Sequence, residues 1–478
     1  MISLHAFVDG EYIKNEEHKA VQVTNPATNE VIGEVPSLSK EEIDFAVSSA
    51  QKAFLKWKKT PASERARLVK QLLSLMQEEN SLNAIGKAIT LEMGKSYSSA
   101  KSEVFYAAEL GEYQTEWARR IEGDIVESDN PNEKILSVRE PLGVVGIIVP
   151  WNFPIYVLVR KMVPALIAGN TVVIKPSIKS PLSALELSKL IGDTDIPKGV
   201  INIVTGEDSV VGEALTSSRE INMITFTGST AVGQRIMEKC ARNMIKVSLE
   251  LGGKAPAVVM EDADIDLAVQ AVTGGRLANS GQVCNNTERV YVQKSIKEKF
   301  VSRLLEEFLN IEYGDGFLNP EIGMTCLVSP NDARRVHAMV EEAVSEGATV
   351  LCGGKLVSKT SSFYPPTLLD NCTQKMNIIH EEVFGPVLPI VEFETLEEVI
   401  ELVNDSDYGL TSNIYSNNYR YIMELTSDIE SGEIYVNRQQ GEAYQGYHSG
   451  WKKSGIGGDD GKHGFYEFTQ IKTVYLKY

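Results

Sequence analysis

One cysteine and one glutamate lie in sequence contexts that favour chemistry over core packing. Cys284 follows the pair Gly281-Gln282 and precedes two asparagines, so we expect its thiol on a turn where it can meet a ligand. Glu250 follows the strand-like residues 247–249, which places its carboxylate at or near the end of a strand. A thiol nucleophile and a carboxylate base are the two groups that form and hydrolyse a thioester.

Each of these residues also has a plainer interpretation. A free cysteine is more often a buried structural thiol, and we assign the other four cysteines to that role: Cys240, Cys326, Cys352 and Cys372. Glu250 could be a salt-bridged or solvated glutamate. Because Leu249 and Leu251 flank it, we expect partial desolvation to raise its pKa towards that of a useful base.

Two further segments follow strand-like runs. Asn152 lies in the loop 150–154, where its amide could donate a hydrogen bond to an oxyanion, although an Asn before Phe-Pro is more often a turn residue. Residues 226–233 read Phe-Thr-Gly-Ser-Thr-Ala-Val-Gly and open a predicted helix. Small residues at a helix N-terminus suit a pyrophosphate, but this motif alone is a weak signal.

The elements that would position these residues predict an α/β fold. Apolar runs at 144–149, 171–175, 201–204 and 223–226 are separated by helix-length segments, the pattern of a buried parallel sheet with crossover helices. A second α/β set starts at 257–260 and continues to about residue 440. Helices are predicted from a capping box at 39–42, from leucines at 68–76 and over 98–119, and a terminal strand at 473–476.

The bulk composition excludes several classes of protein. The 478 residues carry a net charge of −18, which argues against nucleic acid as the main partner. No apolar run is long enough for a membrane span, and the first residues do not form a secretory signal. Five scattered cysteines fit reduced thiols in the cytoplasm, and the isolated histidines predict no metal site.

Taken together, these segments resemble the aldehyde dehydrogenase superfamily from end to end. The match rests on motifs in a fixed order: Asn25-Pro26-Ala27-Thr28, Pro150-Trp151-Asn152-Phe153-Pro154, the run 168–177, Phe226-Thr227-Gly228-Ser229, Leu249-Glu250-Leu251-Gly252-Gly253-Lys254, Gly281-Gln282-Val283-Cys284 and the run 381–387. The resemblance implies a Rossmann-type cofactor domain, an α/β catalytic domain and a small β oligomerisation arm.

The resemblance also implies residue roles. Cys284 would attack the aldehyde, Asn152 and the Cys284 N–H would hold the oxyanion, and Glu250 would activate the water that hydrolyses the thioester. Lys175 and Glu382 would bind ribose hydroxyls. The full implied cofactor set is Val149, Pro150, Trp151, Lys175, Ser177, Ile178, Lys179, Asp208, Gly212, Gly228, Ser229, Val232, Leu251, Glu382 and Phe384.

One position departs from the NAD-preferring members of the family. Many of them carry a glutamate after the Lys-Pro-Ser motif, where it binds the adenosine ribose 2′-hydroxyl; here the residue is Ile178, followed by Lys179. A carboxylate would repel a 2′-phosphate, whereas a neighbouring cation would attract one. We therefore expect NADP, with NAD as the alternative, and Lys179 as a solvated charge if NAD is preferred.

Substrate choice rests on the lactaldehyde/glycolaldehyde dehydrogenase branch, which this chain resembles at residues 160–162 and 442–451. That likeness makes Arg160 and His448 candidates for contacting a small hydroxylated aldehyde such as glyceraldehyde, lactaldehyde or glycolaldehyde. The polar Asn285 beside the thiol also argues against a long apolar aldehyde. Arg160 could instead be a surface charge, or could bind the carboxylate of a semialdehyde, and His448 could be a loop histidine.

The family architecture predicts a dinucleotide-binding domain over 1–122 and 143–252, a catalytic domain over 253–440, and a bridging segment over 123–142 and 441–478. An exposed β-ribbon pairs readily with another chain, so we expect a homotetramer built as a dimer of dimers. Rival functions are a semialdehyde dehydrogenase, a CoA-acylating aldehyde dehydrogenase, in which the equivalent of Glu250 is typically missing, and a non-catalytic binding protein, of which loss of Cys284 or Glu250 would be the mark.

Overall fold

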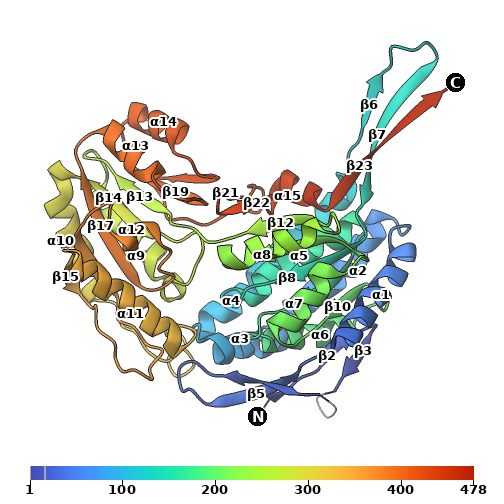
Figure 1. Cartoon of the computed structure of the whole chain (residues 1–478), viewed down its shortest axis with the longest axis horizontal. Helices are drawn as coiled ribbons and strands as arrows, with labels where there is room; N and C mark the ends of the chain where they lie inside the picture. Colours follow the sequence, from blue (N-terminus) through green and yellow to red (C-terminus); the bar gives the residue numbers. More distant parts are fainter. Residues whose placement is uncertain (1, 15–17) are drawn as a thin grey trace.

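The computed structural model describes residues 2–14 and 18–478. The chain forms two large β-sheets, one in each half of the molecule, and a three-stranded ribbon that projects from one end (Figure 1). Residues before Pro256 supply most of one half, and residues from Pro256 to Val436 supply the strands of the other.

The first large sheet has eight strands, and its five central strands are parallel. The antiparallel strands lie at its edges, two on one side and one on the other. In spatial order the strands are β22 (Gly455–Ile456), β12 (Lys246–Glu250), β11 (Ile221–Thr227), β8 (Val144–Ile148), β9 (Thr171–Lys175), β10 (Ile201–Ile203), β2 (Ala6–Val8) and β3 (Glu11–Ile13).

Helices cover both faces of this sheet because successive strand side chains point to opposite faces. Val145 and Ile147 pack in one core cluster with helices α2 to α6, whereas Val144 and Ile148 pack in another with α1, α7 and α8. The helices are α1 (Lys40–Trp57), α2 (Ala62–Met76), α3 (Glu79–Met93), α4 (Tyr97–Thr115), α5 (Pro154–Ala168), α6 (Leu182–Gly192), α7 (Asp208–Ser217) and α8 (Thr230–Ala241), with the 3-10 turn η2 (Glu116–Arg119) after α4.

The second large sheet has seven strands, of which only the edge strand β15 runs antiparallel to its neighbour. In spatial order they are β15 (Thr349–Cys352), β16 (Thr367–Cys372), β17 (Val387–Phe393), β14 (Arg289–Gln293), β13 (Pro256–Val259), β19 (Thr411–Tyr415) and β20 (Glu433–Val436). One face packs on α9 (Ile265–Leu277) and α10 (Lys297–Leu309). The other packs on α11 (Pro330–Ser345), α12 (Asn377–His380), α13 (Leu396–Asn404) and α14 (Tyr419–Asp428). The 3-10 turns η3 (Ala278–Gly281) and η4 (Lys294–Ile296) complete this half.

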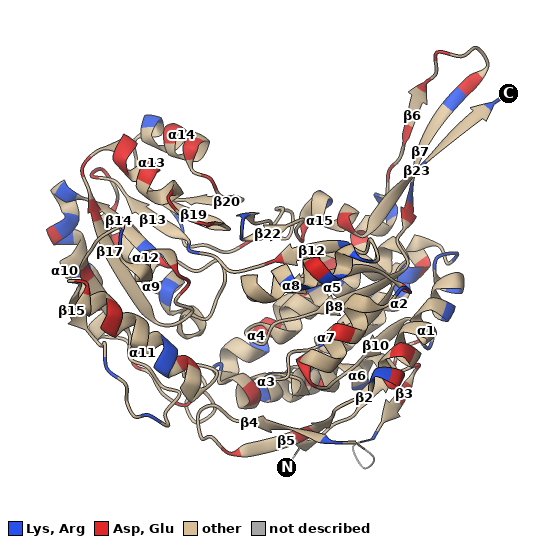
Figure 2. Cartoon of the chain, in the orientation of Figure 1, with Lys and Arg blue, Asp and Glu red and all other residues tan. Residues whose placement is uncertain are grey.

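The projecting ribbon is an antiparallel sheet of β6 (Asp124–Glu127), β7 (Glu133–Pro141) and β23 (Thr469–Lys477). Apolar side chains such as Ile125 and Tyr475 are exposed on it at 76% and 67%, which is unusual for a surface strand. Lys and Arg alternate with Asp and Glu over the ribbon and the outer helices (Figure 2). The segment after residue 440 contributes strands to three sheets: β21 (Trp451–Lys452) pairs with β18 (Tyr408–Gly409), β22 joins the eight-stranded sheet and β23 joins the ribbon. Its helix α15 (Gly461–Glu467) packs on α5.

Two small sheets complete the described residues. One joins β1 (Ile2–Ser3), β5 (Val31–Pro36) and β4 (Ala20–Thr24), and the other joins β18 (Tyr408–Gly409) and β21 (Trp451–Lys452). No helix in the described parts of the chain combines the length and apolar character needed to cross a membrane.

The main elements predicted from sequence are confirmed. The capping box opens α1, where the Glu42 N–H donates to Ser39 Oγ at 3.3 Å and the Ser39 N–H donates to the Glu42 side chain at 2.8 Å. The predicted helix over 98–119 is α4 followed by η2. The antiparallel edge strands β2, β3 and β22 were not predicted, because strands of two or three residues are too short to show an alternating pattern.

Candidate active site

A cavity of about 1260 Å³ lies where loops from the two large sheets meet. Its walls are formed by loops that follow β8, β11 and β12, by the start of α4, and by residues 278–285 and 441–445. Cys284, Glu250 and Asn152 all line this one cavity. The ligand site is therefore at the carboxyl ends of parallel strands, where α/β sheets place it.

The turn before Cys284 is held in an unusual backbone conformation. Asn279, Ser280 and Gly281 all have positive φ angles of 48°, 58° and 78°. At Gly281 a Cβ atom would lie 2.2 Å from the Gly385 carbonyl oxygen, so only glycine fits this position. Gln282 fixes the turn from both ends, donating to the Asn279 carbonyl at 3.0 Å and accepting from the Val328 N–H at 2.8 Å. The predicted turn is confirmed, and it leaves Cys284 half-buried in the cavity wall.

Asn152 is buried beside this turn, and its side chain is already oriented. Its amide Nδ2 donates to the Gln282 carbonyl at 2.9 Å, two residues from Cys284. The backbone carbonyl of Asn152 accepts hydrogen bonds from Lys95 Nζ at 3.0 Å and from Asn279 Nδ2 at 3.3 Å. An amide donor is thus held close to the thiol, as the predicted oxyanion role requires.

Two buried residues that the sequence analysis missed support Asn152. Lys95 forms an ion pair with Glu103, and Glu103 Oε1 accepts from the N–H groups of Ile155 and Tyr156 at 3.0 and 3.2 Å. A carboxylate at the N-terminus of α5 satisfies backbone donors that the helix leaves free. In the sequence this pair is indistinguishable from two charges on an exposed helix face, because its partners lie some fifty residues away in another element.

Glu250 is the last residue of β12, and its side chain points into the cavity wall at 3% exposure. Oε2 accepts from Thr227 Oγ1 at 3.2 Å and lies 3.7 Å from Lys161 Nζ. Oε1 has no hydrogen-bond partner among the residues that the structure describes. The side chain of Asp459 lies within hydrogen-bonding range of the Glu250 carboxylate. Oε1 is unsatisfied but shielded from solvent, so the wall must shift locally before a water molecule can reach it.

The expectation that desolvation by Leu249 and Leu251 raises the pKa of Glu250 is wrong. Burial does raise the pKa of Glu250, but the nearby cations Lys161, His448 and Arg160 outweigh burial and lower it below its usual value. These cations come from α5 and from the C-terminal segment, so the two flanking leucines could not reveal them. Glu250 is consequently ionised and ready to accept a proton.

The three predicted substrate contacts are brought together by a residue that the sequence analysis did not select. Glu442 Oε1 accepts from Asn285 Nδ2 at 2.9 Å, lies 3.3 Å from His448 Nδ1 and lies 3.8 Å from Arg160 Nη2. Arg160, Asn285 and Glu442 line the cavity, whereas His448 lies behind the wall at 1% exposure. The only signal in the sequence was that Glu442 opens the segment 442–451 on which the family likeness rests.

His448 is hydrogen-bonded to the Cys284 side chain and paired with Glu433 Oε1 at 3.3 Å. Burial lowers the pKa of His448, but Glu250 and Glu442 reverse this effect and raise it well above its usual value. Glu433, Glu442 and His448 have their ligand atoms within 4.8 Å of one another, a spacing that a metal ion could bridge. Glu433 and Glu442 both lie 3.3 Å from His448 Nδ1, and ion pairing with a protonated imidazole accounts for this spacing.

A second buried group lies behind Glu250. Lys161 Nζ is 2.7 Å from Asp459 Oδ2, and both side chains are fully buried. Burial, followed by the negative charge of Glu250, raises the pKa of Asp459 to about 6. Lys161 therefore shares its charge between Asp459 and Glu250, and holds both carboxyl groups beside the thiol.

The predicted phosphate-binding motif forms the start of α8. Ser229 is the N-cap residue of α8 but makes no side-chain cap hydrogen bond, which leaves the first-turn N–H groups without a side-chain acceptor. Gly233, one turn into the helix, packs against Leu251 so closely that a Cβ would lie 2.4 Å from that side chain. Gly228 and Ser229 line the cavity, Val232 lies in the first turn of α8, and an uncapped helix start suits a pyrophosphate.

The predicted ribose-binding residues are distributed over both halves. Lys175 at the end of β9 forms an ion pair with Asp208, the first residue of α7. Glu382 accepts from the Gly253 N–H at 3.1 Å, and burial, followed by the charge of Glu288, raises its pKa to about 7. Gly212 in α7 has open space where a side chain would be. Val149 donates its N–H to the Lys175 carbonyl at 3.2 Å, which ties the Pro150 loop to β9.

The loop after β9 carries the residues on which the NADP expectation rests. Ser177 Oγ accepts from the Lys179 N–H at 3.2 Å, and Ile178 packs against the hydrophobic core. Lys179 Nζ lies 3.2 Å from Asp332 and 5.3 Å from the centre of the Trp151 ring. Lys179 is therefore an exposed cation next to the cavity that already has one acidic partner.

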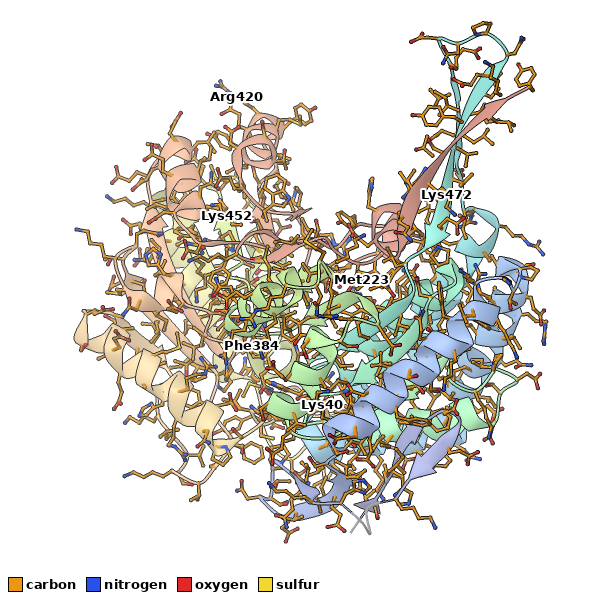
Figure 3. The ribbon with its side chains drawn as sticks, turned by 45° about the vertical axis from the view of Figure 1, so that its right-hand side comes forward. Lys40, Met223, Phe384, Arg420, Lys452 and Lys472 are labelled. Carbon is orange, nitrogen blue, oxygen red and sulfur yellow. The ribbon has the colours of Figure 1, made fainter. Side chains whose placement is uncertain are left out.

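Phe384 lies between the two halves of the molecule (Figure 3). Its ring meets the ring of Trp151 edge-on, with centroids 5.6 Å apart. The turn that carries Phe384 is held by the buried Glu288, which accepts from the Val383 and Phe384 N–H groups at 2.9 and 3.2 Å. Phe384, one of the residues of the implied cofactor set, thus lines the cavity on a turn that Glu288 holds.

The site combines a half-buried thiol, an ionised base and an amide donor with a dinucleotide-type sheet. Comparisons with known proteins agree with this class: the aldehyde dehydrogenase family profile matches residues 12–474. The chain is 45% identical to lactaldehyde dehydrogenase of Escherichia coli K12, with 98% of both chains covered. It is 36% identical to D-glyceraldehyde dehydrogenase (NADP(+)) of Thermoplasma acidophilum, covering 99% of this chain and 96% of that protein.

A solved structure supports the same assignment. The structure of a 3,6-anhydro-L-galactose dehydrogenase in complex with NADP superposes with a TM-score of 0.96 at 41% identity, with 99% of each chain covered. The chain belongs to the aldehyde dehydrogenase family, whose members are oxidoreductases that use NAD or NADP. The predicted fold class is confirmed by this likeness.

Proposed function

We propose that this protein oxidises a small hydroxyaldehyde (glyceraldehyde, lactaldehyde or glycolaldehyde) to its carboxylic acid, with NADP preferred over NAD. One observation carries the proposal: Cys284, Asn152 and Glu250 converge on a single cavity that the polar side chains of Arg160, Asn285 and Glu442 also line. A polar wall that donates hydrogen bonds favours substrates with hydroxyl groups and penalises analogues that lack them.

In the first step the Cys284 thiolate attacks the aldehyde carbon, and a carbon–sulfur bond replaces the carbonyl π bond. The negative charge moves to the aldehyde oxygen, for which Asn152 Nδ2 and the Cys284 N–H are the nearest expected donors. Donors fixed in advance stabilise such an oxyanion without reorganising during the reaction. Because Asn152 Nδ2 now donates to the Gln282 carbonyl, substrate binding must exchange that partner for the oxyanion.

NAD(P), when bound, supplies the acceptor for the hydride that leaves the substrate carbon. The acyl group then remains on Cys284 as a thioester. Glu250 takes a proton from water, the hydroxide oxygen attacks the thioester carbon, and the carbon–sulfur bond breaks to release the acid and the thiolate. The lowered pKa of Glu250 keeps the carboxylate ionised but makes it a weaker base, so its support for this role is its position in the cavity wall.

The preference for NADP is supported by what surrounds the adenosine side of the predicted cofactor site. Ile178 offers no carboxylate to a ribose 2′-hydroxyl, and Lys179 offers a cation that a 2′-phosphate can attract away from Asp332. The glyceraldehyde dehydrogenase relative and the solved 3,6-anhydro-L-galactose dehydrogenase are both described with NADP.

The first test is a panel of initial rates with the three hydroxyaldehydes, each with NADP and with NAD. We expect a higher kcat/KM with NADP for at least one of them. A preference for NAD would mean that Lys179 does not select the cofactor, and no activity with any of the three would move the assignment to semialdehydes.

A second test is the variant Cys284→Ala, which should lower turnover by roughly a thousandfold or more while cofactor binding persists. Substantial turnover in that variant would contradict the nucleophile assignment.

For assembly we propose that the ribbon of β6, β7 and β23 pairs chains into dimers and that two dimers form a tetramer. Its exposed apolar side chains and free strand edges support this. We also place the enzyme in the cytoplasm, since its five cysteines are all free thiols. Light scattering coupled to size exclusion should give a mass about four times that of the chain, and a monomer would refute the assembly.

A further inference from the structure

Arg160 lines the cavity, but its positive charge is already balanced by carboxylates. Its side chain is 5% exposed, its Nη2 lies 2.8 Å from Asp460 Oδ2, and Glu442 Oε1 lies 3.8 Å away on the cavity side. The ring of Tyr156 covers it at 5.0 Å. A buried guanidinium without partners would be strongly unfavourable, so these carboxylates are what keep Arg160 in place.

Asp460 reaches Arg160 from the C-terminal part of the chain. It stands at the start of α15 with a φ angle of 61°, and its side chain is completely buried. Gln114 Nε2 donates weakly to its other oxygen at 3.4 Å. The contact to Arg160 is Coulombic rather than a directed hydrogen bond, because neither Arg160 Nη2 nor Asp460 Oδ2 has a hydrogen-bond partner of good geometry among the described residues.

This arrangement affects charged and neutral substrates differently. A substrate carboxylate that approached Arg160 would meet a guanidinium whose charge Asp460 already neutralises, and would face the ionised Glu442 at short range. Burial raises the pKa of Glu442, but His448 and Arg160 outweigh burial and lower it, so Glu442 keeps its negative charge. A substrate hydroxyl carries no charge and can still exchange hydrogen bonds with Arg160, Asn285 and Glu442.

We propose that Asp460, acting through Arg160, is a specificity-determining residue that makes the cavity reject aldehydes with a terminal carboxylate. The inference rests on the proposed oxidation of small hydroxyaldehydes and explains how the same cavity excludes semialdehydes. Asp460 does not touch the substrate, so it is a positioning residue. Specificity here comes from two carboxylates: Glu442 repels a substrate carboxylate, and Asp460 neutralises the arginine that would otherwise attract it.

The test variant is Asp460→Asn, because asparagine keeps the size and shape of aspartate at this strained backbone position while removing the charge. We expect kcat/KM for 4-oxobutanoate to rise about tenfold or more, the scale expected when a buried cation gains a free carboxylate partner. The values for lactaldehyde and for butanal, an uncharged aldehyde of the same chain length, should change much less. Assays at pH 8.5 keep Asp460 ionised in the wild type, since burial raises its pKa to about 7.

Two controls separate this role from a merely structural one. The double variant Asp460→Asn/Arg160→Met should lose the gain, because Arg160 is the group that Asp460 neutralises. Glu433→Gln removes a carboxylate that pairs with His448 and not with Arg160, and should give no gain with 4-oxobutanoate. If Asp460→Asn does not fold, Glu442→Gln removes the second carboxylate near Arg160 and should give the same direction of change.

Two results would overturn the proposal. One is a folded Asp460→Asn enzyme with unchanged selectivity between 4-oxobutanoate and butanal, and the other is a wild-type enzyme that oxidises 4-oxobutanoate as efficiently as lactaldehyde. The proposed function fails separately: a wild type that prefers butanal to every hydroxyaldehyde, yet still excludes 4-oxobutanoate, would refute the hydroxyaldehyde assignment and leave the role of Asp460 standing.

Discussion

Glu288 and Glu250 are both buried glutamates near the cavity, and they differ in how completely they are paired. The Glu288 carboxylate forms ion pairs with Lys254 Nζ at 2.8 Å and Arg276 Nη1 at 2.6 Å. It also accepts hydrogen bonds from two backbone N–H groups. Glu250 has one hydroxyl donor and a more distant lysine, and its Oε1 has no hydrogen-bond partner among the described residues. A saturated carboxylate holds structure in place, whereas one with a free oxygen and nearby cations can accept a proton.

The same contrast extends to the groups around each glutamate. The Glu288 cluster has two cations for one carboxylate and two backbone donors, and it supports the turn that carries Phe384. The cluster around Glu250 has more carboxyl groups than cations, and Arg160, Glu250 and Glu442 of this cluster line the cavity. Burial, followed by the negative charge of Glu250, raises the pKa of Asp459 to about 6.

The largest effect on turnover should come from removing the charge of Glu250, the incompletely paired carboxylate. Glu250→Gln should lower steady-state turnover by roughly 10²- to 10⁴-fold, because water must then attack the thioester without a base. Mass spectrometry of a single turnover should show acyl-enzyme on Cys284. The exposed Glu298→Gln serves as the control and should retain full activity. Unimpaired steady-state turnover by Glu250→Gln would show that Glu250 is not the base and would leave no functional difference between Glu250 and Glu288.

Glu288, the fully paired carboxylate, should contribute to the stability of the fold rather than to turnover. Glu288→Gln leaves Lys254 and Arg276 buried without their counter-charge and should lower the free energy of unfolding by about 3–5 kcal/mol. Urea unfolding followed by fluorescence measures this, with Glu298→Gln expected within about 0.5 kcal/mol of wild type. If Glu288→Gln lowered the free energy of unfolding by less than about 1 kcal/mol, a full set of hydrogen-bond and ion-pair partners would not mark a carboxylate as structural.

The pH dependence of stability should follow from the same pairing. Burial raises the pKa of Glu288, but Arg276 and Lys254 outweigh burial and lower it to about 2 from a reference value of 4.5. Its stabilising contribution is therefore complete above pH 4.5 and is lost as the pH falls towards 2. The difference in unfolding free energy between wild type and Glu288→Gln should shrink between pH 5 and pH 3. A difference that stays constant over this range would contradict the lowered pKa.

The smallest effect concerns the only hydroxyl bound to Glu250 among the described residues. Thr227→Val keeps the shape of the side chain but removes the 3.2 Å hydrogen bond to Oε2. Losing about 1 kcal/mol of positioning should slow deacylation about fivefold without affecting the acylation burst. In a Glu250→Gln background the same change should cost nothing further, and an equal additional loss would show that Thr227 acts elsewhere.

Local sequence was sufficient to predict the turn that carries Cys284 and the strands of the parallel sheet, because glycine conformations and apolar runs depend on a few neighbouring residues. It was insufficient for the charges that control the site. Lys161 on α5 meets Asp459, and Arg160 meets Asp460, across about three hundred residues of sequence. The direction of the Glu250 pKa was therefore predicted wrongly: its flanking leucines are local, whereas the cations that decide its pKa are not.

The position of Glu250 in the chain has a mechanical consequence. It ends β12 of one large sheet, and Pro256 begins β13 of the other, so only five residues connect them at this crossing. The chain crosses between the halves again from β20 to β22, so Glu250 lies next to one of two connections that join them. A rotation of one half of the molecule against the other would therefore bend the backbone directly beside the base.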